Sequence, residues 1–256
     1  VAINTFRAAI RDKILYNLLI FALVLIVGSA LLSTLTFVEQ TKIISDFGLA
    51  GINLFGVLMA IFLGIGLVSK EIERKTLYTV LSKPISRTQF LLGKYAGLLL
   101  TLAVNTIIMT IALYLTLMLH QIKWNLPLLD LEPRLLLAIG MIYLQLALLT
   151  AVALLFSTFT TTTLAAIFTL SIYVIGHISK DLVALGEKLP AKSTAFILKA
   201  VYYTLPNLSN FDIKGLVVHK VQIPADYFLM TFLYAICHIA LLMGIASFVF
   251  NRRDLK

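Results

Sequence analysis

The chain has 256 residues, of which 60% are hydrophobic and only 13% are charged, and its mean hydropathy is +0.99. Soluble domains carry about a quarter charged residues, so this composition excludes an ordinary water-soluble fold. The formal charge of +9 sits in short stretches beside apolar runs, which makes anionic lipid headgroups, rather than nucleic acid, the expected partners.

Long uncharged runs divide the chain into membrane spans, because a hydrocarbon core needs about 20 apolar residues. The run from 135 to 179 is too long for one helix and is interrupted by the hydroxyl-rich stretch 157–163, which predicts two spans joined by a tight turn. The first run is too long for a signal peptide and predicts a retained helix. We predict an all-α integral membrane protein with a single domain over 1–256. Its six expected spans are 14–38, 47–69, 95–119, 135–156, 161–179 and 227–251.

The distribution of Lys and Arg predicts the orientation of these spans. If both termini are cytoplasmic, the cytoplasmic stretches hold twelve of the 21 basic residues in 51 positions, and the opposite stretches hold nine in 71. The excess favours cytoplasmic termini. Trp124, Tyr16, Tyr95 and Tyr227 fall at span ends, as interfacial anchors do.

The cytoplasmic stretch 69–94 has the pattern of two short helices separated by a break. Apolar residues around Leu77 share one helical face. Pro84 disfavours helical geometry at the residue before it, so the first helix is expected to end there. Ser86 and Gln89 have the spacing of a capping box, which predicts a second helix running into the third span. This pattern predicts a rigid elbow at the membrane surface, and a solvated basic loop is the alternative.

Three motifs in this stretch resemble the signature of type-2 ATP-binding-cassette exporter permeases. They are Glu71-x-Glu73-x-x-Thr76-Leu77, Leu81-Ser82-Lys83-Pro84-Ile85-Ser86-Arg87 and Leu92-Gly93-Lys94. Leu205-Pro206-Asn207, near the last span, carries the same resemblance. The resemblance implies a type-2 exporter permease fold with a cytoplasmic coupling helix, external helices between spans five and six, and a second permease copy, in a homodimer or a heterodimer. It also implies that 69–94 docks onto a separate ATPase subunit through Glu71, Glu73, Arg74, Leu77, Pro84 and Arg87.

Motifs for chemistry are missing from the sequence. It contains no phosphate-binding G-x-x-x-x-G-K-[ST] loop, so we expect no cofactor in this chain and ATP bound by a partner. The predicted spans contain no Asp or Glu, which disfavours ion-coupled transport. The four histidines form no H-E-x-x-H motif, and His238 beside Cys237 is more typical of a packed pair than of a metal ligand. We therefore predict neither an enzyme nor a metal site.

Three polar side chains inside the predicted spans are candidates for a transport pathway: Asn53, Asn105 and Gln145. The alternative is that they only bond neighbouring helices to one another. Residues 1–13 have the composition of an amphipathic surface helix, which corresponds to the connecting helix of the similar permeases, and a basic tail is the alternative.

The loop 179–226 has apolar positions at helical spacing, Phe196, Ile197, Ala200, Val201 and Leu205, and is expected to pack as helices on the outer face. We expect the permease of an ATP-driven exporter in a bacterial or archaeal cytoplasmic membrane. The alternative is a membrane anchor that transmits force from an ATPase to a periplasmic partner bound at 179–226.

Overall fold

The computed structural model describes residues 1–34, 40–73, 86–124, 133–188, 198–200 and 202–252, and no strand occurs among them. The helices in chain order are α1 (Ala2–Ile10), α2 (Lys13–Ser33), α3 (Gln40–Glu73), α5 (Arg87–Lys123), α6 (Arg134–Phe159), α7 (Thr162–Lys188), η2 (Leu208–Phe211), α9 (Lys214–Val218) and α10 (Ala225–Arg252). Residues 198–200 and 202–204 are also helical. Six helices, α2, α3, α5, α6, α7 and α10, are long and apolar enough to cross a membrane, which confirms the predicted six spans.

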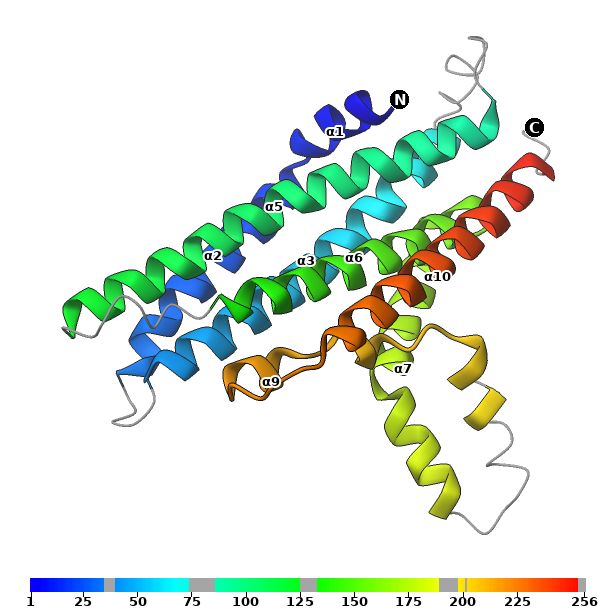
Figure 1. Ribbon diagram of the computed structural model, residues 1–256. Helices are drawn as coiled ribbons and strands as arrows, with labels where there is room; N and C mark the ends of the chain where they lie inside the picture. Colours follow the sequence, from blue (N-terminus) through cyan, green and yellow to red (C-terminus); the bar gives the residue numbers. More distant parts are fainter. Residues whose placement is uncertain (35–39, 74–85, 125–132, 189–197, 201, 253–256) are drawn as a thin grey trace.

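The helices α3 and α6 form the centre of the bundle (Figure 1). In an apolar 18-residue stretch of each of these two helices, 72% of the residues are buried. The corresponding share is 22% or less in α2, α7 and α10. Small residues let the central pair approach closely: the α carbon of Gly64 faces Ala153, and that of Gly56 faces Leu146. Close approach at small residues is a main source of helix association in lipid, where no hydrophobic effect draws helices together. The apolar outer faces of the peripheral helices are left for lipid or for another protein chain.

Several helices extend beyond the predicted spans. The second span was expected from residue 47, but α3 begins at Gln40. Helix α5 begins at Arg87, eight residues before the expected third span, as the predicted capping box requires. An uncharged run marks the hydrocarbon core, whereas a helix satisfies its own backbone and continues through charged residues into the interface. The 37 residues of α5 span about 55 Å, against about 30 Å for the core. Likewise α7 continues to Lys188, nine residues beyond the end predicted for the fifth span.

Two helix junctions follow from local side-chain bonds. The predicted turn within 157–163 lies between α6 and α7, where Thr160 is extended and its hydroxyl donates to the carbonyl of Phe156 at 2.7 Å. At the other junction, Asp12 caps α2 by accepting from the amide of Ile14 at 2.9 Å. The predicted N-terminal helix is α1, which ends at Ile10 just before this cap.

The region that holds η2 and α9, between α7 and α10, packs back onto the bundle. Gly176 of α7 makes room for it, because an added Cβ there would lie 2.6 Å from the carbonyl oxygen of Pro206. Asn207, in the Leu-Pro-Asn motif, caps η2 by accepting from the amide of Ser209 at 3.1 Å. The hydroxyl of Tyr234 in α10 accepts from the Asn207 amide at 2.7 Å. Of the apolar residues predicted to form helices here, Phe196, Ile197 and Val201 lie outside the described residues.

Candidate coupling end

The predicted docking segment, 69–94, includes the end of α3, the start of α5 and the residues that join them. The backbone is helical at Glu71 and at Glu73, which is the last residue of α3, and α5 starts at Arg87. The other predicted docking residues, Arg74, Leu77 and Pro84, lie outside the described part of the chain. The segment is therefore flanked on both sides by helices that run unbroken across the membrane.

The capping box predicted at Ser86 and Gln89 is confirmed. The Gln89 amide donates to the Ser86 hydroxyl, and the Ser86 amide donates to the side-chain oxygen of Gln89, both at 3.2 Å. These reciprocal bonds satisfy amide groups that a helix start otherwise leaves unpaired. They fix the residue at which α5 begins.

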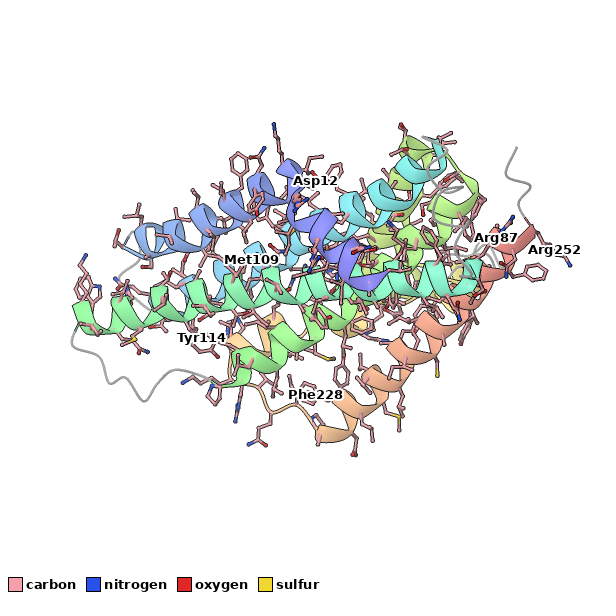
Figure 2. All side chains as sticks on the ribbon, turned by 90° about the horizontal axis from the view of Figure 1, so that it is seen from above. Asp12, Arg87, Met109, Tyr114, Phe228 and Arg252 are labelled. Atoms are coloured by element: carbon pink, nitrogen blue, oxygen red, sulfur yellow. The ribbon has the colours of Figure 1, made fainter. Side chains whose placement is uncertain are left out.

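The guanidinium of Arg87 joins the start of α5 to the end of α10. Its Nη1 donates to the carbonyl oxygens of Phe250 at 3.1 Å and Asn251 at 3.2 Å. A cation at a helix C-terminus pairs with unsatisfied carbonyls and with the negative end of the helix dipole. Figure 2 shows Arg87 and Arg252 at the same end of the molecule. The contacts described for this predicted docking residue are thus made within its own chain.

Further contacts strengthen the junction of α5 with α10. The hydroxyls of Thr88 and Ser247 lie 2.7 Å apart, and the amide of Asn251 donates to Thr88 at 3.3 Å. Beneath them the rings of Phe90 and Phe250 stack with centroids 6.2 Å apart. We call this set, with Arg87, the α5–α10 clamp. Sequence reasoning missed the α10 half of the clamp, although Ser247 and Asn251 are polar residues one helical turn apart at the end of an apolar helix.

The same part of α5 holds α1. An added Cβ on Gly97 would lie 2.5 Å from the carbonyl oxygen of Ala2 and 2.6 Å from Cβ of Thr5, and one on Gly93 would lie 2.6 Å from Cβ of Val1. The two glycines are four residues apart, so both are on one face of α5. The N-terminal helix is thereby packed directly on the helix that leaves the docking segment.

Two of the three candidate pathway residues meet in the centre of the bundle. The amide of Asn53 in α3 donates to the hydroxyl of Tyr173 in α7 at 3.4 Å, and Gln145 in α6 lies close to this hydroxyl. Asn105 is separate and donates to the carbonyl of Thr101 in its own helix at 2.8 Å. All three are buried within the chain. Sequence analysis did not select Tyr173 as a candidate, because a tyrosine within an apolar run is usually an aromatic residue of the core.

A line of polar groups leads from this cluster along α7 to the region between α7 and α10. The rings of Tyr173 and His177 lie 5.6 Å apart, and Nε2 of His177 lies 3.1 Å from Oδ2 of Asp212. The ammonium of Lys214 is 3.5 Å from the other oxygen of this carboxylate. The hydrogen bond with His177 lowers the pKa of Asp212 below its usual value of 3.8; burial opposes this shift and Lys214 adds to it. Asp212 in its ionised form therefore holds the region between α7 and α10 against α7.

The Asp212 contact predicts a loss of stability in acid. A carboxyl whose pKa is lower in the folded than in the unfolded state contributes stability above its unfolded value, near 4, and loses that contribution as the pH falls through the folded value. We expect the thermal midpoint of the protein in detergent to fall by a few degrees more between pH 5 and pH 3 than that of Asp212→Asn. Asp181→Asn, which changes an exposed carboxylate of α7, serves as the control and should follow the unmodified protein. Equal acid responses of Asp212→Asn and the unmodified protein would contradict the assignment.

The pair Cys237 and His238 has a structural explanation. Nδ1 of His238 lies 3.0 Å from the carbonyl oxygen of Tyr234, and the two rings are 4.0 Å apart. Cys237 is exposed on the outside of α10. Within the described ranges, no group of three or more His, Cys, Asp or Glu side chains is arranged to hold a metal ion.

The six apolar helices found among the described residues define a multi-pass helical membrane protein. Residues 1–255 match the family model described as ABC-2 family transporter protein. The chain belongs to this family and is a membrane permease subunit of an ABC transporter. The family as a whole implies an ABC ATPase partner and dimerisation. A comparison with curated proteins gives no match.

Proposed function

We propose that this permease is half of the membrane part of an ATP-driven exporter, in which two copies face each other and a separate ATPase docks at residues 69–94. The observation that carries the proposal is the continuity of α3 and α5, which both run from this segment across the whole membrane. ATP is bound and hydrolysed in the partner, and the end of the bundle that holds the segment and both termini faces the cytoplasm. The membrane is the cytoplasmic membrane of a bacterium or archaeon.

The contacts of α5 indicate how movement would spread. The α5–α10 clamp joins α5 to the sixth span, and Gly93 and Gly97 join it to α1. A displacement of the docking segment would therefore move α1, α5 and α10 together, while α3 would carry it to the central helix α6. Two discrete arrangements of such packed helices are the usual basis of a switch between inward and outward access.

Co-expression with the cognate ATPase tests this proposal. We expect a membrane complex that moves cargo out of the cytoplasmic side only with hydrolysable ATP, and several-fold slower ATP hydrolysis after Glu71→Gln. Asp226→Asn is the matched control, because it removes one carboxylate at the opposite end of the bundle, at the start of α10. Small molecules that co-purify from native membranes identify the cargo.

Three results would contradict the proposal. The first is that no ATPase co-purifies with the permease, and the second is that the Glu71→Gln complex assembles and hydrolyses ATP at the full rate. The third is ATP hydrolysis without any movement of cargo, which would favour a membrane anchor that transmits force to an envelope partner.

A further inference from the structure

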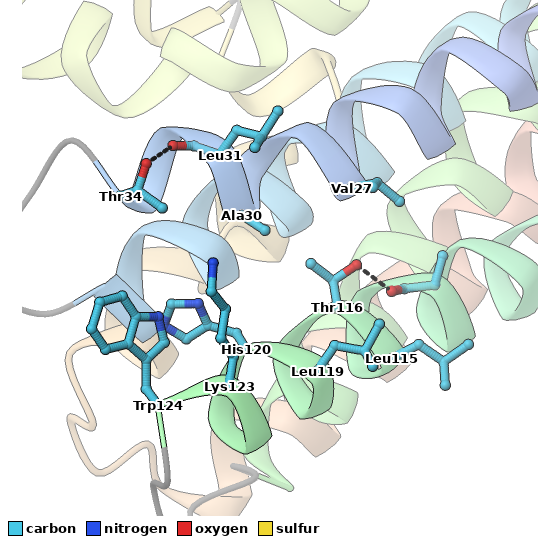
Figure 3. A pocket seen from close by; sticks show the side chains of 11 residues that line it. Val27, Ala30, Leu31, Thr34, Leu115, Thr116, Leu119, His120, Lys123 and Trp124 are labelled. Carbon is cyan, nitrogen blue, oxygen red and sulfur yellow. Dashed lines mark hydrogen bonds between the residues drawn. The ribbon is translucent and has the colours of Figure 1, made fainter.

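A cavity of about 420 Å³ lies between α2 and α5 at the end of the bundle opposite the docking segment (Figure 3). Its walls come from the last turns of both helices. The lining residues are Val27, Ala30, Leu31, Thr34, Ala112, Leu115, Thr116, Leu119, His120, Lys123 and Trp124. The volume lies within the usual range for small-molecule sites, about 300 to 1,000 Å³.

The length of the cavity corresponds to one leaflet of a bilayer. Its lining on α5 runs from Ala112 to Lys123, eleven residues apart, which at about 1.5 Å per residue is roughly 16 Å. Half of a hydrocarbon core is about 15 Å thick. The walls are aliphatic along most of this length, and Trp124, at the end of α5, has the position of an interfacial anchor. A molecule that fills the cavity would lie along the leaflet with its polar end at the membrane surface.

The polar end of the cavity is basic. His120 and Lys123 both line it, and no carboxylate is among the described residues of the lining. The side chain of His120 is only 6% exposed, and its Nε2 finds no hydrogen-bond partner among the described residues. Figure 3 shows His120, Lys123 and Trp124 grouped at this end, with Thr34 of α2 on the opposite wall. A buried nitrogen without a partner costs free energy, and an acceptor oxygen entering the cavity would remove that cost.

We propose that this cavity binds an anionic glycerophospholipid, with an acyl chain between α2 and α5 and its phosphate against Lys123 and His120. The assignment rests on two features of the cavity, its aliphatic walls and its basic end. A zwitterionic phospholipid brings its own cation with its phosphate and would not neutralise Lys123, and a free phosphate would leave the aliphatic length of the cavity unfilled. The site is separate from the docking end, so its occupancy does not depend on an ATPase partner.

Trp124 is the only tryptophan of the chain, so the indole fluorescence of the protein comes from a residue that lines this cavity. The protein is placed in phosphatidylcholine vesicles that contain increasing fractions of phosphatidylglycerol or phosphatidylcholine brominated on the acyl chains, since bromine quenches indole at short range. We expect half-maximal quenching at about fivefold less brominated phosphatidylglycerol than brominated phosphatidylcholine, the preference that one lysine near a membrane surface provides. Lys123→Gln should abolish this preference and His120→Leu should reduce it. Lys180→Gln, which removes a lysine exposed on α7 outside the cavity, should retain it.

Each other outcome overturns the proposal. Equal quenching by the two lipids would mean that the cavity does not select an anion. Equal loss of the preference in Lys180→Gln and Lys123→Gln would assign it to general surface charge. Relief of quenching by glycerol 3-phosphate at millimolar concentration would mean that the site takes a soluble phosphate. If Lys123→Gln lowers the thermal midpoint but keeps the lipid preference, the lysine serves only the end of α5.

Discussion

Replacing Gly64 with leucine is expected to destabilise the bundle more than the same change at any glycine on its surface. A Cβ at Gly64 would lie 2.8 Å from Cβ of Ala153 and 3.8 Å from the carbonyl oxygen of Thr150, so α3 and α6 would have to separate. Overpacking of this kind costs about 1 to 3 kcal/mol. We expect a lower thermal midpoint in detergent and a smaller yield of folded protein, with Gly64→Ala intermediate between leucine and glycine.

The matched control is Gly28→Leu in α2. An added Cβ at Gly28 meets no atom within 4 Å, so this change gains the helix propensity of leucine, up to about 1 kcal/mol, without a clash. The control should be neutral or slightly stabilising. A midpoint for Gly64→Leu equal to that of Gly28→Leu would show that the contact between α3 and α6 is not as close as described.

Features set by short stretches of sequence could be predicted, because the physics that produces them is local. Charge-free runs located the six spans, since the bilayer excludes charge whatever the helices pack against. The capping box at Ser86 and Gln89 was also predictable, because its partners are three residues apart. The start of α3 and the end of α7 were not predictable, because both helices continue through charged residues that bound the charge-free runs.

Contacts between distant parts of the chain were beyond sequence reasoning. Arg87 was assigned to a partner from its motif, while its described bonds reach α10, 163 and 164 residues away. The pairing of Asn53 with Tyr173 and of His177 with Asp212 likewise depends on which helices are neighbours. A single sequence gives the periodicity of each helix, but the choice of neighbour is made by packing at small residues such as Gly56 and Gly64.

The position of the clamp changes what a mutation at the docking end would mean. Loss of activity after a change at Arg87 would ordinarily be assigned to a lost contact with the ATPase. The structure supplies a second cause, since the α5–α10 clamp lies between the docking segment and the sixth span. The two causes differ in one observable: a docking residue affects assembly with the ATPase, whereas a clamp residue leaves assembly intact and affects only what the bound ATPase does to the permease.

Arg87→Leu is therefore expected to leave the complex assembled but uncoupled. The change removes two charge-assisted bonds to the end of α10, and hydrogen bonds to charged groups are worth about 1.5 to 3 kcal/mol, the lower end applying to this half-buried site. We expect unchanged co-purification of the ATPase and a several-fold loss of ATP-driven transport per ATP hydrolysed. Arg252→Leu is the matched control, because Arg252 lies at the same end but packs on Phe248 of its own helix, with 4.3 Å between the guanidinium carbon and the ring centroid. An equal loss of transport in both variants would show that the positive charge at this end matters and the clamp does not. If the ATPase no longer co-purifies with Arg87→Leu but still co-purifies with Arg252→Leu, Arg87 is a docking residue.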